Sequence, residues 1–340
     1  MPISPTQSAE LQKKIWTGSI PLEIRLAASD CRTYDESDPY LVQIPRLSYL
    51  AFLLPRLHAF FLPNLISPEV QAHEAWLSFE GVPLKWHYPL GLLYDLYSGA
   101  EPVNFEKPRQ DDLAASQATV ETASGTSPLP WKLTIHFTEY PGDQLIQLDA
   151  DGRAILDSYI NAVKEADYIR NGTARTVMSM SKEDSDNLWL SVQRRELILL
   201  SEHRSETNAC IDDLKLFNSV NNKLLNPPGL ELRHAPLKIY LPTSANQTAS
   251  DTISEEMRQA GHIRVVQSLI PLQLPTRQPQ TLGTALHSVL PTIFPSRRSP
   301  VFAQPVLHGA VVPLAAPIGD LSRAAAYPDG FLHVAVVMLA

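Results

Sequence analysis

The sequence predicts an α+β protein in three parts, with two mixed strand-and-helix units flanking a helix-rich segment. Three observations predict this arrangement. Up to about residue 141, apolar residues alternate between a period of two and a helical period. From about 149 to 226 only the helical spacing occurs. The breaker Asn-Pro-Pro-Gly at 226–229 then precedes a stretch in which both periods return. A chain of 340 residues is long enough for roughly two or three domains.

The first part opens with Ile15–Leu26, which we interpret as a strand pair or hairpin because apolar residues alternate at its end. Tyr40–Ile44 is predicted to be another strand. Pro45 follows at a position where a helix can begin, since the first helical turn tolerates proline. Pro55 should kink or split this helix. Its apolar stripe comprises Leu47, Leu50, Leu54, Leu57 and Phe61.

The most informative segment is Phe79–Leu96, which reads FEGVPLKWHYPLGLLYDL. An apolar strand end leads into a Gly-Val-Pro turn and a Lys-Trp-His-Tyr cluster, and helical spacing begins after Pro89. We expect a strand, a turn, a strand and a short helix whose side chains are mostly core. Trp76–Phe79 and Trp131–Phe137 supply two further strands. The small, polar segment 98–128 is predicted to be a flexible insertion.

The middle part is predicted to be helical. Asp149 or Asp151 can cap the first helix, and Ser185 can cap the second. The charged segment 194–211 fits neither neighbouring helix and is expected to be an extra loop or a helical extension. The apolar stripes of the three helices are Ile155, Leu156, Tyr159, Ile160, Val163 and Ala166, then Leu188, Trp189 and Val192, then Leu214, Phe217, Val220 and Leu224.

The third part is expected to repeat the element order of the first. A short helix capped by Thr281 and a one-turn helix at Leu321 lie among its strands. The predicted strands are Pro236–Leu241, Ile263–Ile270, Val306–Val312 and Phe331–Met338. The order strand, strand, helix, strand, short helix, strand is that of a β-grasp domain of the ubiquitin type.

These elements give the predicted domains. We assign 1–146 to an N-terminal helix and the first ubiquitin-like domain, 147–229 to the helix-rich domain, and 230–340 to the second ubiquitin-like domain.

Composition excludes several classes of function. The net charge of −8 argues against a nucleic-acid binder, which would normally present a basic face. The longest apolar run, Tyr49–Pro63, is interrupted by proline, arginine and histidine and is too short to cross a bilayer. Residues 1–14 lack the apolar core of a signal peptide. We therefore expect a cytoplasmic protein.

A search for catalytic chemistry finds little. The sequence has no glycine-rich nucleotide motif, no Cys-x-x-Cys and no His-Glu-x-x-His, so neither a cofactor nor a metal is expected. Cys31 and Cys210 are interpreted as reduced thiols, with one long-range disulfide as the alternative. A thioester nucleophile needs a cationic surrounding, whereas Asp212 and Asp213 follow Cys210. The isolated histidines are interpreted as structural: His58, His73, His87, His136, His234, His287, His308 and His333.

The end of the sequence bears on ubiquitin-like chemistry. A transferred modifier needs a flexible tail that ends in glycine, whereas this sequence ends in Val-Val-Met-Leu-Ala straight out of a predicted strand. We therefore do not expect a donor of a modifier, while an acceptor role stays open.

Several blocks, in order along nearly the whole chain, resemble the autophagy-related protein 5 family. The run Gly-x-Pro-Leu-Lys-Trp-His-Tyr-Pro is highly specific. Long insertions near 98–128, 194–211 and 243–260 depart from the family and suggest a fungal-type member. The matching residues are Ile15-Trp16 with Gly18 and Ile20-Pro21, Ile44–Leu50, Phe79–Leu96, Leu129–Phe137, Lys164–Asp167, Asn187–Trp189 and Tyr327–His333.

The resemblance implies a non-enzymatic scaffold of autophagosome formation. Family members accept the ubiquitin-like autophagy-related protein 12 through an isopeptide bond on the lysine of a Lys-Glu-Ala-Asp block, here Lys164. They also bind an amphipathic helix of autophagy-related protein 16 in a groove where the three domains meet. Trp16, Trp76 and Trp86 are expected to be mainly core.

The assembled conjugate is expected to act as an E3-like factor. With the E2-like enzyme of the lipidation system, it would promote lipidation of autophagy-related protein 8 with phosphatidylethanolamine. The chain would be peripheral at the pre-autophagosomal membrane, and it would serve autophagy and cytoplasm-to-vacuole transport.

The helical position of Lys164 is compatible with the acceptor role. At 100° per residue, Lys164 lies about 120° from the centre of the apolar stripe, at the border of the buried face, so its amine can reach solvent. Glu165 and Asp167 are expected to hold this amine protonated until a partner enzyme deprotonates it. Two alternatives stay open: an unconjugated adaptor that recruits partners through its ubiquitin-like folds, and an enzyme with a catalytic cysteine.

Overall fold

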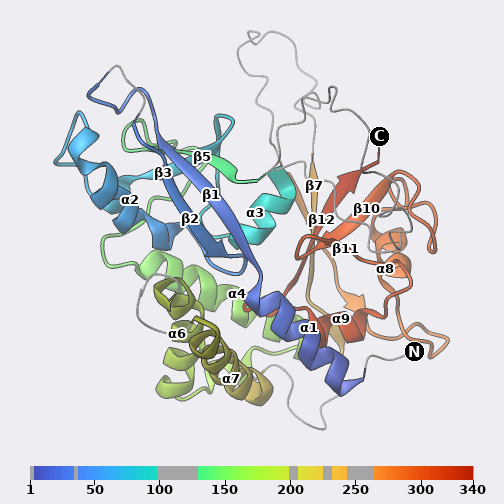
Figure 1. The fold of residues 1–340 in the computed structure, drawn as a ribbon. Coiled ribbons are helices and arrows are strands. Elements are labelled where there is room, and N and C mark those ends of the chain that lie inside the picture. Colours follow the sequence, from blue (N-terminus) through green and yellow to red (C-terminus); the bar gives the residue numbers. More distant parts are fainter. Residues whose placement is uncertain are drawn as a thin grey trace, which may run out of the picture.

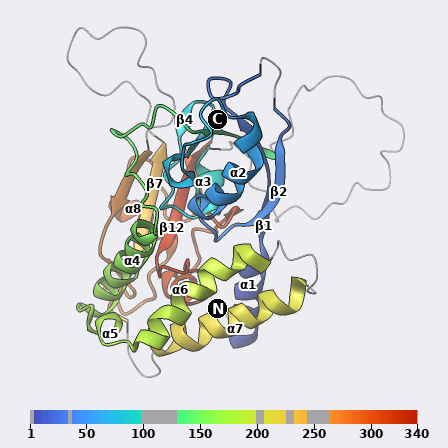
Figure 2. The same cartoon turned by 90° about the vertical axis from the view of Figure 1, so that its left-hand side faces the viewer.

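The structure is a computed structural model that describes residues 4–33, 37–97, 129–198, 206–224, 232–242 and 263–339. Two five-stranded sheets each carry helices, and a group of longer helices lies beside them (Figures 1 and 2). The predicted fold class, two β-grasp domains flanking a helix-rich domain, is confirmed. The insertions predicted at 98–128 and 243–260 lie outside the described residues.

The first sheet has the order β2-β1-β5-β3-β4, in which β1 and β5 are parallel and the other pairs are antiparallel. Along β1 every second side chain is buried, as the alternating sequence predicts. The described elements of this part are α1 (Pro5–Thr17), β1 (Ser19–Leu26), β2 (Tyr40–Pro45), η1 (Leu50–Leu53), α2 (Leu54–Phe61), η2 (Leu62–Asn64), η3 (Ala72–Glu74), β3 (Trp76–Phe79), β4 (Val82–Pro83), α3 (Leu90–Tyr97) and β5 (Trp131–His136).

The second sheet has the order β11-β10-β12-β7-β8, with β7 and β12 parallel in the middle. In chain order, the five strands of this sheet correspond to those of the first: β7 to β1, β8 to β2, β10 to β3, β11 to β4 and β12 to β5. The two sheets therefore share one topology. The described elements are β6 (His234–Ala235), β7 (Leu237–Pro242), β8 (Ile263–Gln267), β9 (Ile270–Pro271), α8 (Leu282–Val289), β10 (Ala303–Leu307), β11 (Ala310–Val311), α9 (Ile318–Ala324) and β12 (Leu332–Met338).

The helix-rich part comprises α4 (Arg153–Asn171), α5 (Arg175–Met178), α6 (Lys182–Ile198) and α7 (Glu206–Leu224). Helices α6 and α7 pack along each other, and α1 of the first part contacts both α7 and α9 (Figure 1). The rings of Trp16 and Phe217 lie 5.1 Å apart at the contact between α1 and α7. The N-terminal helix therefore joins all three parts.

Two predictions at the start of the chain are wrong. Ile15–Thr17 belongs to α1 and not to a hairpin, because Ser4 and Gln7 form a capping box and Pro5 occupies the first turn. No helix begins at Pro45. The chain turns there, since the Ser48 N–H donates to Pro45 O at 3.0 Å, and α2 begins at Leu54 with Pro55 in its first turn.

Other elements differ from prediction at their boundaries. Helix α6 begins at Lys182, since Ser181 and not Ser185 accepts the capping hydrogen bond, from the Asp184 N–H at 3.0 Å. The segment 194–211 is helical at both ends, to Ile198 and from Glu206. The predicted strand at 306–312 is instead a hairpin, and the strand at 263–270 divides into β8 and β9.

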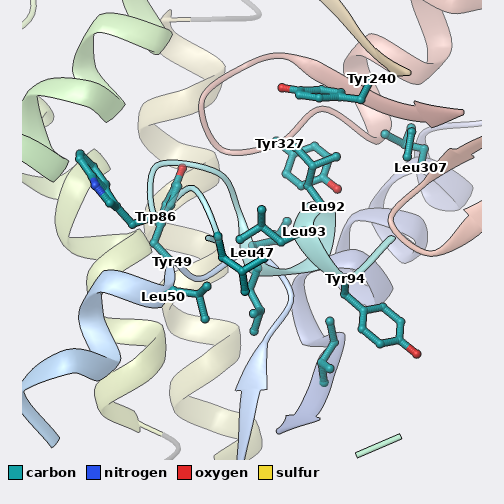
Figure 3. Packing of buried hydrophobic residues seen from close by; sticks show 14 of the residues in the cluster. Leu47, Tyr49, Leu50, Trp86, Leu92, Leu93, Tyr94, Tyr240, Leu307 and Tyr327 are labelled. Carbon is teal, nitrogen blue, oxygen red and sulfur yellow. The ribbon is translucent and has the colours of Figure 1, made fainter. Parts of the chain in front are cut away.

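Buried residues of all three parts join in one apolar cluster. Figure 3 shows Leu92 and Leu93 of α3 between Leu47 of the first domain and Tyr327 of the second. The segment Phe79–Leu96 forms β3, β4 and α3, as predicted, and most of α3 is buried. Because the three parts share one core, their positions relative to one another are fixed.

Candidate functional site

Lys164 lies on the long helix α4, whose ends are well defined. At the N-terminus, the Asp149 carboxylate accepts hydrogen bonds from the Arg153 N–H at 2.9 Å and the Ala154 N–H at 2.8 Å. These bonds lower the pKa of Asp149. At the C-terminus, Gly172 caps the helix in the left-handed region, at φ 75°. Of the two predicted caps, Asp149 binds the first turn, although Gly152 occupies the N-cap position itself.

The surroundings of Lys164 change from core to solvent within three residues. Val163 is fully buried, Lys164 is partly exposed, and Glu165 is exposed. The predicted apolar stripe of α4 supplies the buried side, through Ile155, Tyr159, Val163 and Ala166. Lys164 therefore occupies the margin of a rigid helix, where its stem can rest on protein while the amine meets water.

The two carboxylates expected to hold the amine of Lys164 bind other groups. Glu165 pairs with Lys238 of β7 at 2.9 Å and accepts from Gln267 of β8 at 3.0 Å. Partial burial would raise the pKa of Glu165, but its hydrogen bonds with Lys238 and Gln267 lower it. The buried Asp167 accepts from Asn171 at 2.6 Å and from the Val177 N–H at 3.1 Å. Helix α4 therefore uses both carboxylates to contact other parts of the structure, Glu165 the second sheet and Asp167 the α5 segment.

Helix α4 is further tied to the loop at 327–331 of the second domain. The Tyr159 hydroxyl donates to Pro328 O at 3.0 Å, and Arg170 Nη2 donates to Gly330 O at 2.6 Å. Arg170 is only 1 % exposed, and burial lowers its pKa to about 10. These contacts fix the helix that carries Lys164 against the second sheet.

The same loop is held by a buried polar chain. Asp329 Oδ2 lies 2.7 Å from His333 Nε2, and His333 Nδ1 lies 2.7 Å from the Tyr240 hydroxyl. Burial alone would raise the pKa of Asp329, but the His333 ring and the Phe331 N–H lower it. His333 therefore lies buried in a hydrogen-bonded chain that holds the 327–331 loop.

An ion pair ties the two ubiquitin-like domains to each other. Arg46 follows β2 and pairs with Asp95 of α3, while Asp95 Oδ2 accepts from the Gly309 N–H in the β10–β11 turn at 2.8 Å. Gly309 has φ 80°, and a Cβ there would lie 3.0 Å from the Arg46 guanidinium. Sequence reasoning missed Arg46 and Asp95, because their partner lies more than 200 residues further along the chain.

A hollow lies where the three parts meet. It is lined by side chains of α1, α7 and α9 and by the 327–331 loop, among them Trp16, Phe217, Arg323 and Tyr327. Trp16 and Trp86 are buried, as predicted. Trp76 is partly exposed, and its ring stacks on His136 at 3.9 Å.

The structure also bears on a catalytic cysteine, a bound metal and a membrane span. Cys31 is partly buried, and its Sγ lies 3.4 Å from the Thr33 hydroxyl. The side chain of Cys210 lies outside the described residues. Within the described ranges, no three His, Cys, Asp or Glu side chains gather so that they could hold a metal ion. None of the helices in these ranges has both the length and the apolar character that a membrane crossing requires.

Comparison with known proteins places the chain in a family. Residues 15–137 match the UblA domain of autophagy protein ATG5, residues 152–227 its alpha-helical bundle region, and residues 234–336 its UblB domain. Autophagy protein 5 of Phaeosphaeria nodorum is 52% identical over 98% of both chains. That of Aspergillus fumigatus is 45% identical over 97% of this chain and 96% of its own.

A solved structure supports the fold. The crystal structure of Kluyveromyces marxianus Atg5 covers 96% of this chain and 99% of its own, with a TM-score of 0.61 and 21% identity. Two ubiquitin-like domains, a helical bundle between them and near-full-length similarity agree, and the chain therefore belongs to the autophagy protein 5 family and has a role in autophagy.

Proposed function

We propose that the chain is a non-enzymatic scaffold that accepts the ubiquitin-like autophagy-related protein 12 through an isopeptide bond at Lys164. The observation that carries this proposal is the placement of Lys164, partly exposed at the margin of a helix anchored to the second sheet. The Lys-Glu-Ala-Asp block supplies the acceptor lysine in the family that the chain resembles. An amine on a rigid helix loses little conformational entropy when a carrier approaches.

The engaged carboxylates define what a partner enzyme must do. Because Glu165 binds Lys238 and Gln267, and Asp167 binds Asn171 and Val177, neither is available as a general base for Lys164. A base from the incoming enzyme must therefore remove the proton before the amine attacks the thioester. In this proposal the chain positions the amine of Lys164, and the partner enzyme supplies the general base.

The assembly would then use the chain as a platform. The hollow formed by α1, α7, α9 and the 327–331 loop is our candidate for the amphipathic helix of autophagy-related protein 16, since helices from all three parts line it. We propose that the conjugate acts as an E3-like factor in lipidation of autophagy-related protein 8, in the cytoplasm and peripherally at the pre-autophagosomal membrane.

Replacing Lys164 with arginine tests the proposal. The variant keeps the positive charge and the fold but lacks a nucleophilic amine, so the conjugate should disappear from a denaturing gel. Lys182→Arg is the matched control, because Lys182 is exposed at the start of α6 in the same domain. A conjugate that persists at full level in Lys164→Arg would refute the assignment. If no conjugate forms even with the unmodified sequence, the chain is instead an unconjugated adaptor.

A further inference from the structure

The loop between α8 and β10 holds the longest run of exposed residues in the described ranges, residues 297–302. Both ends of this loop are anchored. Before it, the carbonyl oxygen of the buried Phe294 lies 2.8 Å from His287 Nδ1, and after it the buried Ala303 begins β10. Helix α8 and β10 lie on the side of the second domain away from α6 and α7, so those helices do not cover the loop (Figure 1).

Ser299 lies in the middle of this exposed run. The Arg298 N–H and the Ser299 N–H both donate to the Ser296 hydroxyl, at 3.3 and 3.2 Å, so the backbone here is held in place. The hydroxyl of Ser299 itself makes no hydrogen bond with any residue in the described part of the chain. Pro300 follows, and a proline restricts the residue before it to an extended backbone. An enzyme that modifies hydroxyl groups would therefore meet an exposed, extended and unengaged serine.

The sequence has four Ser-Pro dipeptides, and Ser299 is the only one of these serines that follows an arginine. Ser4 belongs to the capping box of α1, where its hydroxyl accepts from the Gln7 N–H at 3.3 Å. Ser67 is only partly exposed, and its dipeptide is followed by Glu69. Ser127 lies outside the described residues. Among the three serines that the structure describes, Ser299 alone combines exposure with an unengaged hydroxyl.

Two arginines directly before Ser299 would supply counter-charge for a phosphate group. Arg297 and Arg298 are exposed, and they belong to a stretch from Met257 to Gly319 that contains five arginines and no acidic residue. A phosphoserine carries a charge of about −1.5 to −2 at neutral pH and three acceptor oxygens that pair well with guanidinium groups. Within this stretch no carboxylate competes for the two arginines. A phosphate on Ser299 would therefore lower the positive charge of the stretch from five to roughly three.

We propose that Ser299 is a phosphorylation site, modified by a proline-directed serine/threonine kinase with ATP as the phosphoryl donor. The Ser299 Oγ bonds to the γ-phosphorus of ATP, the bond from that phosphorus to the β–γ bridging oxygen breaks, and ADP leaves. The hydroxyl proton passes to the catalytic carboxylate of the kinase, so no oxidant or reductant takes part. Pro300 indicates the kinase class, since such enzymes select a serine whose next residue has no N–H. This modification goes beyond the acceptor role, because it requires neither Lys164 nor a bound modifier.

Incubation of the unconjugated full chain with a purified cyclin-dependent kinase and MgATP tests this proposal. Peptide mapping by mass spectrometry should find most of the transferred phosphate on Ser299. Ser299→Ala should lose that phosphate completely. Pro300→Ala keeps the hydroxyl but should lose most of the phosphate, because the kinase no longer finds proline at the next position. Both residues are exposed, so neither substitution should change the melting temperature, and a loss of phosphate cannot be ascribed to unfolding.

Ser67→Ala is the matched control, because Ser67 also precedes a proline but is less exposed and has no arginine before it. This variant should take up as much phosphate as the unmodified chain. The same phosphopeptide should occur in the chain isolated from cells that express it. An unmodified Ser299 in the kinase reaction, phosphate chiefly on another serine, undiminished phosphorylation of Pro300→Ala, or absence of the phosphopeptide from growing and starved cells would each overturn the proposal. Lys164→Arg should be phosphorylated normally, so failure of the acceptor role is distinguishable.

Discussion

Replacement of Asp95 by alanine should loosen the contact between the two ubiquitin-like domains. Asp95 accepts hydrogen bonds from Arg46 in the first domain and from the Gly309 N–H in the second. The side chains of Arg46 and Asp95 are only 14% and 4% exposed. Alanine would therefore leave the Gly309 N–H without its acceptor and the Arg46 guanidinium without a carboxylate, with only its bond to Gly91 O at 3.1 Å, in a largely buried place.

The loss of stability depends on whether Asp95 alone or both Asp95 and Arg46 are replaced. Burial raises the pKa of Asp95 although Arg46 works in the opposite direction, so desolvation offsets much of the attraction within the pair. Apolar replacement of both residues should accordingly cost less than about 1.5 kcal/mol. Removal of Asp95 alone should cost about 3 kcal/mol, because it leaves Arg46 buried and uncompensated.

Urea unfolding of Asp95→Ala, of Arg46→Met and of the double variant measures this difference. The double variant should be destabilised by at least about 2 kcal/mol less than the sum of the single variants. Asp212→Ala is the control, because Asp212 pairs with Lys215 on an exposed face and should change stability by about 0.5 kcal/mol or less. Additive single variants, or a cost below about 1 kcal/mol for Asp95→Ala, would refute the reasoning.

Two further predictions concern packing and pH. Gly283→Ala should lower the melting temperature, at a cost of about 1–3 kcal/mol, because its Cβ would meet Arg297 O, whereas Gly319→Ala on α9 has only Leu272 at 4.0 Å and should be neutral or stabilising. Burial lowers the pKa of His308 to about 3, and the ring Nε2 donates to Ala325 O at 2.9 Å. In the unfolded chain His308 takes up a proton near pH 6.5, whereas in the folded chain it does not. The free energy of unfolding should therefore fall as the pH drops from 6.5 toward 3. The slope should be at most about 1.4 kcal/mol per pH unit, and less because His308 as a residue is only partly buried. Melting curves at pH 7.5 and 5 should show this loss, and a His308→Gln variant with an unchanged pH dependence would contradict it.

Local patterns predicted the elements that local interactions determine. Thr281 caps α8 through a capping box with Thr284, as its sequence context indicates, and the alternation in β1 matches its burial. The errors occurred where neighbouring signals competed. Ser181 and Ser185 both precede the apolar residues of α6, and the structure uses the earlier one. Likewise, the apolar end of α1 resembles the strand that follows it.

The surroundings of the candidate site could not be predicted in the same way. The position of Lys164 at the helix margin follows from helical periodicity alone. The partners of Glu165 lie 73 and 102 residues away, and Arg170 reaches a carbonyl 160 residues away. Such contacts depend on how the domains pack. The sequence alone therefore did not show that Glu165 binds Lys238.

Mass spectrometry of the conjugate tests the central claim most directly. The chain would be isolated from starved cells that express it, digested and searched for branched peptides. The account predicts one branched peptide, in which the terminal carboxylate of the modifier is joined to Nζ of Lys164. A branch at any other lysine, with an unmodified peptide containing Lys164 in the same conjugate, would contradict it.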